Sequence, residues 1–338
     1  MTTQPALAVV GATGLVGEAF IELLADRELP IGELFVLASE NSQGKTVFRG
    51  KSGLKVRNAA DFDFSQVRIA VFAAGAAVAQ QLAPKAAEAG ALVLDLSPAF
   101  RYEPDVPLLV ANVNDEQLGA AFERNLAAAA DAATVQLLWA LKPLADLGEL
   151  VRVSVSQMQA ASSSGRAGVE RLARQSARLL NGLDADEGEG KQYAFNLLPV
   201  AGRLQDNGYS SEELKLMLES RRVLGQPQLA VDATCVQVPV FHGLAQSVSV
   251  QGLLPITLAQ AEACWEAAPG LRMDEGGDTD SASPARHIHG EPHVRIARVR
   301  EDLDGLGMLH FWTVADNIKV GAALNAVLLV EKLLKDHL

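Results

Sequence analysis

The chain has few cysteines and no excess of positive charge. Its 338 residues include only Cys235 and Cys264, which provide neither a disulfide framework nor a metal-binding spacing. With 29 basic and 41 acidic residues the net charge is −12, which argues against nucleic-acid binding because a nucleic-acid surface needs a basic stripe. We therefore expect a reduced protein without a nucleic-acid partner.

Long hydrophobic runs are missing as well. No apolar stretch approaches the roughly 20 residues of a membrane-spanning helix, and no cationic, apolar leader precedes the first expected strand. The composition, 49% hydrophobic and 21% charged, is typical of a globular chain long enough for two domains. These observations predict a cytoplasmic protein without a membrane partner.

The sequence is organised around a glycine-rich turn near its start. The apolar run Ala6–Val10 leads into Gly11, Gly14 and Gly17, and an amphipathic segment follows. In a dinucleotide-binding turn the first glycine allows the bend, the second admits a phosphate and the third lets helix and strand pack closely. Unpaired N–H groups at the helix start favour an anion. The pattern predicts dinucleotide binding; the alternative is a glycine-rich turn without a ligand.

The end of the second expected strand, Glu33–Ser39, is where such a fold meets the adenine ribose. A carboxylate there favours the ribose hydroxyls, and an arginine favours a 2′-phosphate. Glu40 and Asn41 follow the strand, without an arginine. NAD and NADP therefore both remain possible, and a solvated loop is the alternative.

Strands and helices alternate through most of the first half. Further strands are expected at Arg68–Ala74, Ala91–Leu96 and Pro107–Val110, with a helix at about Ala77–Ala89. Such unbroken apolar strands are typical of a parallel sheet covered on both faces. The alternating pattern of Val151–Met158 marks a change to half-buried strands after about residue 148.

The second half predicts a mixed, largely antiparallel sheet with helices on one face. Its expected elements are helices ending near Asn181, opening at Ser211 and spanning about Leu258–Ala267, strands at Ala230–Val240, Gln246–Gln251, Val294–Val299 and Met308–Val314, and a last helix at Gly321–Leu334. The fold class is thus α/β: a Rossmann-type domain, residues 1–130 plus the last helix at about 318–338, and an α+β domain, residues 131–317.

The loop after Ala127–Ala130 lies where many enzymes carry a nucleophile. It holds alanines and Asp131, with no Cys, Ser or Lys to act as one. We predict that Asp131 caps the helix that follows.

Several stretches together resemble the aspartate-β-semialdehyde dehydrogenase family over nearly the whole chain, and most closely its Usg-like branch, which lacks the chemistry. They are GATGLVG (Gly11–Gly17), LASxxSxGK (Leu37–Lys45), DLSPAFR (Asp95–Arg101), ATVQLLWALKPL (Ala133–Leu144), QAASSSG (Gln159–Gly165), FNLLP (Phe195–Pro199), SEELK (Ser211–Lys215), TCVQVPVFHG (Thr234–Gly243) and ADNIKVGAALNAV (Ala315–Val327). The resemblance implies a dinucleotide-binding domain, an α+β dimerisation/substrate domain of the semialdehyde dehydrogenase type, and a homodimer with an apolar sheet face of obligate size.

The family reduces aspartyl phosphate to the semialdehyde with NADPH, using a cysteine thioester and a histidine acid/base. By the resemblance, the cysteine falls on Ala132, the histidine on Leu244 and the substrate-carboxylate arginine on Gln237. The 2′-phosphate arginine falls on Asn41, and the asparagine beside the cysteine falls on Asp131. A methyl group cannot form a thioester and a leucine cannot move a proton.

Other family positions are kept. Gln159 matches the acyl-orienting glutamine, Arg101 and Lys215 the phosphate-binding cations, Glu212 the substrate-binding acid and Asn317 a cofactor contact. The resemblance assigns cofactor contacts to Gly11, Thr13, Gly14, Leu15, Val16, Gly17, Ser39, Asn41, Ser42 and Asn317. The alternative for Arg101 and Lys215 is that of plain surface cations.

Replacement chemistry has few candidates. Cys235 and Cys264 are expected to be packing residues. His242 lies two residues before Leu244 and shares its face only if the strand continues through Gly243. His287, His289 and His293 with Glu291 have a spacing that hints at metal, but a solvated strand edge is favoured and no metal is predicted.

Three functions follow as hypotheses. The first is a catalytically silent homologue that binds a nucleotide or small anion and dimerises. The second is an NAD(P)-dependent oxidoreductase that acts on an aldehyde or oxo group in amino-acid biosynthesis with changed catalytic residues. The third is a structural partner that forms mixed dimers with a genuine family enzyme.

Overall fold

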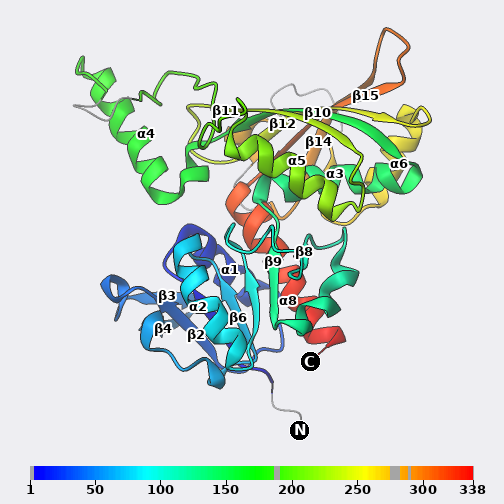
Figure 1. Cartoon of the computed structure of the whole chain (residues 1–338). Helices are drawn as coiled ribbons and strands as arrows, with labels where there is room; N and C mark the ends of the chain where they lie inside the picture. The colour runs from blue at the N-terminus through cyan, green and yellow to red at the C-terminus, as the bar shows by residue number, and fades with distance from the viewer. Residues whose placement is uncertain (1–3, 186–190, 275–281, 288–290, 338) are drawn as a thin grey trace. The chain divides into compact units, whose positions relative to one another are not determined.

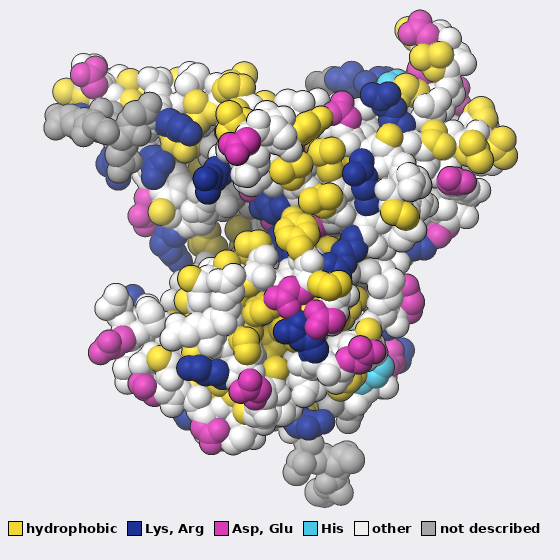
Figure 2. Space-filling model, viewed as in Figure 1, with side chains coloured by type: hydrophobic (Ala, Val, Ile, Leu, Met, Phe, Trp, Pro, Cys, Tyr) yellow, Lys and Arg dark blue, Asp and Glu magenta, His cyan; other side chains and the backbone are white. Residues whose placement is uncertain are grey.

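The computed structural model describes residues 4–185, 191–274, 282–287 and 291–337 (Figure 1). The chain divides into two compact units, Met1–Asp131 with Ala322–Leu338, and Ala132–Gly321. No helix in the described ranges is long and apolar enough to cross a membrane. On the face shown in Figure 2, acidic and basic side chains are interspersed.

The first unit is built on a seven-stranded sheet in the order β5-β2-β1-β6-β7-β9-β8, with every neighbouring pair parallel. The strands are β1 (Leu7–Val10), β2 (Leu34–Ala38), β5 (Arg57–Asn58), β6 (Ile69–Phe72), β7 (Leu92–Asp95), β8 (Leu108–Leu109) and β9 (Leu126–Ala129). Nearly all their side chains are buried, because this sheet is covered on both faces. The predicted parallel sheet is confirmed.

Helices α1 (Leu15–Asp26), α2 (Ala76–Glu88) and α8 (Asn325–Asp336) pack in this unit. Helix α8 is tied to α1 by the Arg27–Glu331 ion pair, and Asn325 Oδ1 accepts the backbone N–H of Ala111 at 2.8 Å. The helical structure at the end of the chain begins before the expected Gly321, because a π-helical segment, Asn317–Leu324, precedes α8.

A two-stranded hairpin, β3 (Thr46–Arg49) and β4 (Ser52–Lys55), follows β2 and was not expected from the sequence. Short 3₁₀ segments, Glu40–Ser42, Ala59–Asp61, Phe64–Gln66 and Asp115–Glu123, occupy other connections. The strand expected at Pro107–Val110 is reduced to Leu108–Leu109.

The second unit holds a six-stranded sheet in the order β11-β10-β12-β15-β14-β13. Its strands are β10 (Leu150–Gln159), β11 (Ala230–Gln237), β12 (Leu244–Gly252), β13 (Leu271–Met273), β14 (Val294–Glu301) and β15 (Met308–Ala315). Pairs β10–β11 and β13–β14 are parallel and the other three are antiparallel, so the predicted mixed sheet is confirmed.

Helices α3 (Ala132–Leu147), α5 (Ser211–Val223) and α6 (Leu258–Ala267) lie on one face of this sheet (Figure 1). Helix α4 (Gly165–Leu180) and the short α7 (Pro284–His287) complete the unit. The cap of α5 is Ser210 rather than Ser211, because the Ser210 hydroxyl and the Glu213 carboxylate form a capping box.

The other face of the sheet is mixed: an apolar row of Val236, Met158, Ala245 and Val314 lies beside more polar rows, and the apolar dimer face stays a prediction. One of the more polar rows holds Ser154, Ser249 and His310, and the next holds Ser156, Ser247 and Trp312. The side chains of these two rows are exposed or half-buried. Ser249 Oγ and His310 Nδ1 lie 2.7 Å apart, so this face can meet a partner through hydrogen bonds as well as through apolar contact.

Candidate functional site

The glycine turn of the first unit is enforced by packing. Gly11 has φ +88°, and a Cβ built there would lie 2.4 Å from the Ala73 carbonyl oxygen. A Cβ on Gly17 would lie 2.3 Å from the Gly11 oxygen. Gly14 caps α1 without any side-chain hydrogen bond, so the N–H groups of Leu15 and Val16 have no side-chain acceptor at the cap. The turn is therefore a backbone cradle that fits a phosphate.

The loop after β2 lies beside this turn. Thr13 Oγ1 donates to Ser42 Oγ at 3.5 Å, and Ser39 caps the 3₁₀ turn that carries Glu40, Asn41 and Ser42. Asn41 is exposed and Ser42 half-buried. The carboxyl ends of β1 and β2 thus bring together the residues that a dinucleotide-binding fold uses for phosphate and ribose.

Lys45 was not among the expected cofactor contacts. Its Nζ donates to Ser42 Oγ at 3.4 Å, which places a cation at the ribose end of the cradle. The signal for it in the sequence is its place as the last residue of the LASxxSxGK stretch, three residues after Ser42.

Arg101 is buried rather than presented to solvent. Its side chain is 4% exposed, Nη1 lies 3.1 Å from Asp131 Oδ2, and Nε and Nη2 donate to the carbonyls of Ala129 and Leu96. The plain surface-cation alternative is wrong for Arg101. The guanidinium that the resemblance assigns to phosphate already has a carboxylate partner in Asp131, the position to which the resemblance assigns a neutral asparagine.

Asp95 lies at the carboxyl end of β7 in the same unit. Its carboxylate accepts hydrogen bonds from Ser97 N at 3.0 Å and Ser97 Oγ at 2.8 Å. Burial raises the pKa of Asp95 to about 6, against the lowering effect of these hydrogen bonds and of Arg101. The loop that carries Arg101 therefore starts from a carboxyl group that titrates near pH 6.

In the second unit three site positions form one row across adjacent strands. Gln159, the last residue of β10, pairs in register with Gln237 of β11 and with Leu244 of β12. Leu244 is 1% exposed. The row therefore presents two amides and a buried aliphatic side chain at the positions to which the resemblance assigns a glutamine, an arginine and a histidine.

Three of the residues that the resemblance matches to the family pattern, Gln159, Glu212 and Lys215, lie in contact. Gln159 Nε2 donates to Glu212 Oε2 at 3.4 Å, and Lys215 Nζ lies 2.8 Å from Glu212 Oε1. Asn317 Oδ1 accepts from Ser162 Oγ at 2.8 Å and from Gly243 N at 3.2 Å. The structure thus places Gln159, Glu212 and Lys215 in one polar chain, and Asn317 beside the turn that precedes Leu244.

Ala132 is the first residue of α3 and packs closely against the segment that carries Gly321. A Cβ on Gly321 would lie 2.7 Å from the Ala132 Cβ, so the two chain segments touch here. The start of α3 is tied to β12 because Gln246 Nε2 donates to Ala133 O at 3.0 Å and Gln136 Nε2 to Leu244 O at 3.2 Å. Positions 132 and 244 therefore belong to neighbouring elements linked by buried amides.

The possible replacements do not assemble around these positions. Cys235 is fully buried in β11, and burial raises the pKa of the Cys264 thiol to about 11, so that it is protonated at neutral pH. Strand β11 ends at Gln237 rather than Val240, since Pro239 has no N–H and Gly243 turns with φ +100°. His242 therefore lies in a turn and not on a strand shared with Leu244.

The histidine group hinted at by spacing is only partly described. His289 lies outside the described residues, and His293 Nε2 is 3.0 Å from Glu291. Among the described residues, no three His, Cys, Asp or Glu side chains are grouped to hold a metal ion.

Known families match both units. Residues 6–121 match the model "Semialdehyde dehydrogenase, NAD binding domain", and residues 141–320 match "Semialdehyde dehydrogenase, dimerisation domain". The chain is thus a semialdehyde dehydrogenase-type protein with a nucleotide-binding and a dimerisation domain. It belongs to the aspartate-semialdehyde dehydrogenase family.

Individual relatives carry two kinds of name. Aspartate-semialdehyde dehydrogenase 2 of Vibrio cholerae is 42% identical over 100% of both chains, and a USG-1 protein homolog of Azotobacter vinelandii is 39% identical over 97% of each. The Vibrio cholerae aspartate semialdehyde dehydrogenase II complexed with ASA has a TM-score of 0.96 at 41% identity and is covered over 100% of both chains. The fold is therefore that of the enzymes, and identity alone does not separate the two names.

Proposed function

We propose that this chain is a family member that keeps the nucleotide-binding scaffold and the dimer but does not carry out the family's thioester reaction. The observation that carries the proposal is the row formed by Gln159, Gln237 and Leu244, together with Ala132 on the adjoining helix start. Neither Ala132 nor Leu244 has an atom that can attack a carbonyl or transfer a proton.

The charged residues support binding rather than turnover. Lys215 and Glu212 form an ion pair whose side chains are 20% and 19% exposed, and Gln159 joins it through its amide. Such a group can hold a small anion or an amino-acid-like molecule. It does not replace a thiolate and an acid/base placed on opposite sides of a reacting carbon.

The nucleotide is proposed from the cradle. The backbone around Gly11, Gly14 and Gly17 fits a phosphate, and Ser39, Asn41 and Ser42 lie next to it for a ribose. Lys45 beside Ser42 supplies a positive charge that the missing arginine would otherwise provide. When bound, the nicotinamide would supply hydride chemistry. This chain's own residues hold the phosphates and the ribose.

The dimer is proposed as a homodimer through residues 141–320, the matched dimerisation domain. The mixed uncovered face of the sheet, with Ser249 hydrogen-bonded to His310, supports an interface that combines apolar contact with hydrogen bonds. Mixed dimers with an active relative are the second candidate partner, and co-purification of such a relative would indicate them.

A calorimetric titration of the purified protein with NADP⁺ and, separately, NAD⁺ tests the scaffold. Binding in the micromolar range is expected, with NADP⁺ weakened in Lys45→Gln and unchanged in the matched control Lys51→Gln on the same hairpin. Binding of neither nucleotide would contradict a nucleotide-binding role. It would also remove the reading of an oxidoreductase with changed residues, and would leave a structural partner.

A further inference from the structure

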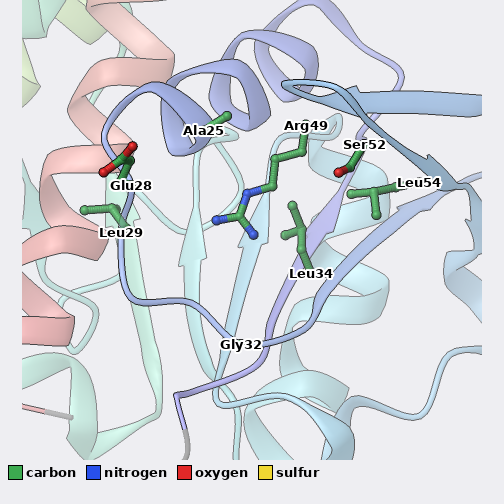
Figure 3. Close-up of a pocket in the computed structure, with 8 residues that line it drawn as sticks. All are labelled: Ala25, Glu28, Leu29, Gly32, Leu34, Arg49, Ser52 and Leu54. Carbon is green, nitrogen blue, oxygen red and sulfur yellow. The ribbon is translucent and has the colours of Figure 1, made fainter.

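A hollow of about 560 Å³ lies in the first unit, at the end of β2 away from the glycine turn (Figure 3). It is bounded by the end of α1, the start of β2 and the β3–β4 hairpin, and its apolar lining includes Ala25, Leu29, Leu34 and Leu54. This volume is in the range of small-molecule sites, and apolar walls with few polar groups are their usual composition. The hollow shares no lining residue with the proposed nucleotide cradle.

Two side chains of opposite charge line the hollow. Arg49, the last residue of β3, is half-buried and extends its guanidinium into the hollow in Figure 3, and Glu28, just after α1, also lines it. Within the described part of the chain neither side chain has a hydrogen-bond or ion-pair partner, and the two do not pair with each other. Five guanidinium N–H donors beside an apolar wall match a carboxylate, and Glu28 matches an ammonium.

We propose that this hollow binds a small α-amino acid with an apolar side chain. Its carboxylate would pair with Arg49, its ammonium group with Glu28, and its side chain would pack on Leu34 and Leu54. A zwitterion fits because one molecule satisfies both charges, which form no ion pair with each other in the described part of the chain. A plain anion would leave Glu28 unpaired and near its own negative charge. The proposal stands independently of the proposed function.

The first test is a calorimetric titration of the full chain with three related probes. L-Leucine carries both charges, 4-methylpentanoate lacks the ammonium group, and 3-methylbutylamine lacks the carboxylate. We expect L-leucine to bind and each single-charge analogue to bind at least about 10-fold more weakly. No L-leucine binding up to about 10 mM, or equal binding of 4-methylpentanoate, would overturn the proposal.

Variants then assign the binding to this hollow. Arg49→Gln and Glu28→Gln should each weaken L-leucine by about 10-fold or more. The controls Lys51→Gln, on the same hairpin as Arg49, and Asp26→Asn, at the end of α1 two residues before Glu28, change the charge equally outside the lining and should leave it unchanged. Thermal unfolding without ligand checks that each variant folds. Unchanged L-leucine affinity in a folded Arg49→Gln protein would overturn the assignment.

Discussion

The glycine turn of the first unit and the Gln159–Gln237–Leu244 row of the second differ in what holds them in place. A side chain at Gly11 or Gly17 would collide with backbone oxygens at 2.4 and 2.3 Å, so these glycines are required by packing whatever the turn binds. Leu244, by contrast, is 1% exposed and fills its place as an ordinary core residue. Binding sites built from backbone persist with the fold, whereas side-chain chemistry can be exchanged for packing.

The largest expected effect concerns the proposed loss of the thioester chemistry. Ala132→Cys alone should give no semialdehyde-dependent NADPH formation, because the thiol still lacks an acid/base and a substrate cation. The triple variant Ala132→Cys/Leu244→His/Gln237→Arg supplies the nucleophile, the acid/base and the substrate cation together and should give measurable turnover. The gain should be large, because loss of a nucleophile alone can cost about a million-fold in a hydrolase. Substantial turnover by the single variant would contradict the positions assigned to the three residues.

Asp95 should give the first unit a pH-dependent stability. Its pKa is raised from 3.8 to about 6 by burial, so the folded state holds the proton more tightly than the unfolded state. Stability from this group is therefore greatest below pH 3.8, falls as the pH rises to about 6, and is lower by about 3 kcal/mol above that. Asp95→Asn should flatten this slope in urea unfolding at pH 4 to about 7.

The contribution of Asp63 to stability changes with pH in the opposite direction to that of Asp95. Hydrogen bonds from Ser65 lower the pKa of this exposed carboxyl group, so its contribution is present above pH 3.8 and is lost as the pH falls through the folded-state pKa. A slope left unchanged by Asp95→Asn would show that Asp95 is not the titrating group.

Gly17→Ala should damage both stability and nucleotide binding. The new methyl must displace the Gly11 carbonyl, which costs roughly 1–3 kcal/mol for an overpacked site and disturbs the phosphate cradle. The matched control is Gly75→Ala, at the start of α2, where φ is −69° and a Cβ would meet nothing within 4 Å. Equal urea midpoints for the two variants would contradict the packing argument.

Asp131→Asn should have a smaller effect on stability and a specific effect on anions. Removing the carboxylate partner of buried Arg101 should cost roughly 1–2 kcal/mol, less than in a fully buried pair because Asp131 is 23% exposed. Asp105→Asn breaks a more exposed contact to Arg124 and should cost under about 1 kcal/mol. Inorganic phosphate should bind more tightly to the Asp131→Asn variant than to the unmodified protein. Unchanged phosphate affinity would show that Asp131 does not compete for Arg101.

The strands and the fold class could be predicted because each depends on local pattern. The unbroken apolar runs of β1 and β6 predict buried parallel strands, and the alternation within β10 predicts a half-covered one. The β3–β4 hairpin was missed because its short strands are largely exposed and carry no clear alternation.

The contacts in the site that the sequence could not predict join residues that lie far apart along the chain. Gln159 pairs with Leu244 in antiparallel register although the two are 85 residues apart, and Arg101 meets Asp131 from 30 residues away. A sequence pattern carries no register between strands, so neither contact could be read from it. The helix-capping role of Asp131 stays a prediction beside its observed ion pair.

The most direct test of the account is a steady-state assay of the unmodified chain. Aspartate semialdehyde, phosphate and NADP⁺ are mixed with the protein and NADPH formation is followed, with a Lys215→Met variant prepared in parallel. The account predicts no rate above background and no difference between the two proteins. A rate that is clear in the unmodified chain and lost in Lys215→Met would mean that the site is catalytic, and would contradict the claim that Ala132 and Leu244 have ended the family's reaction.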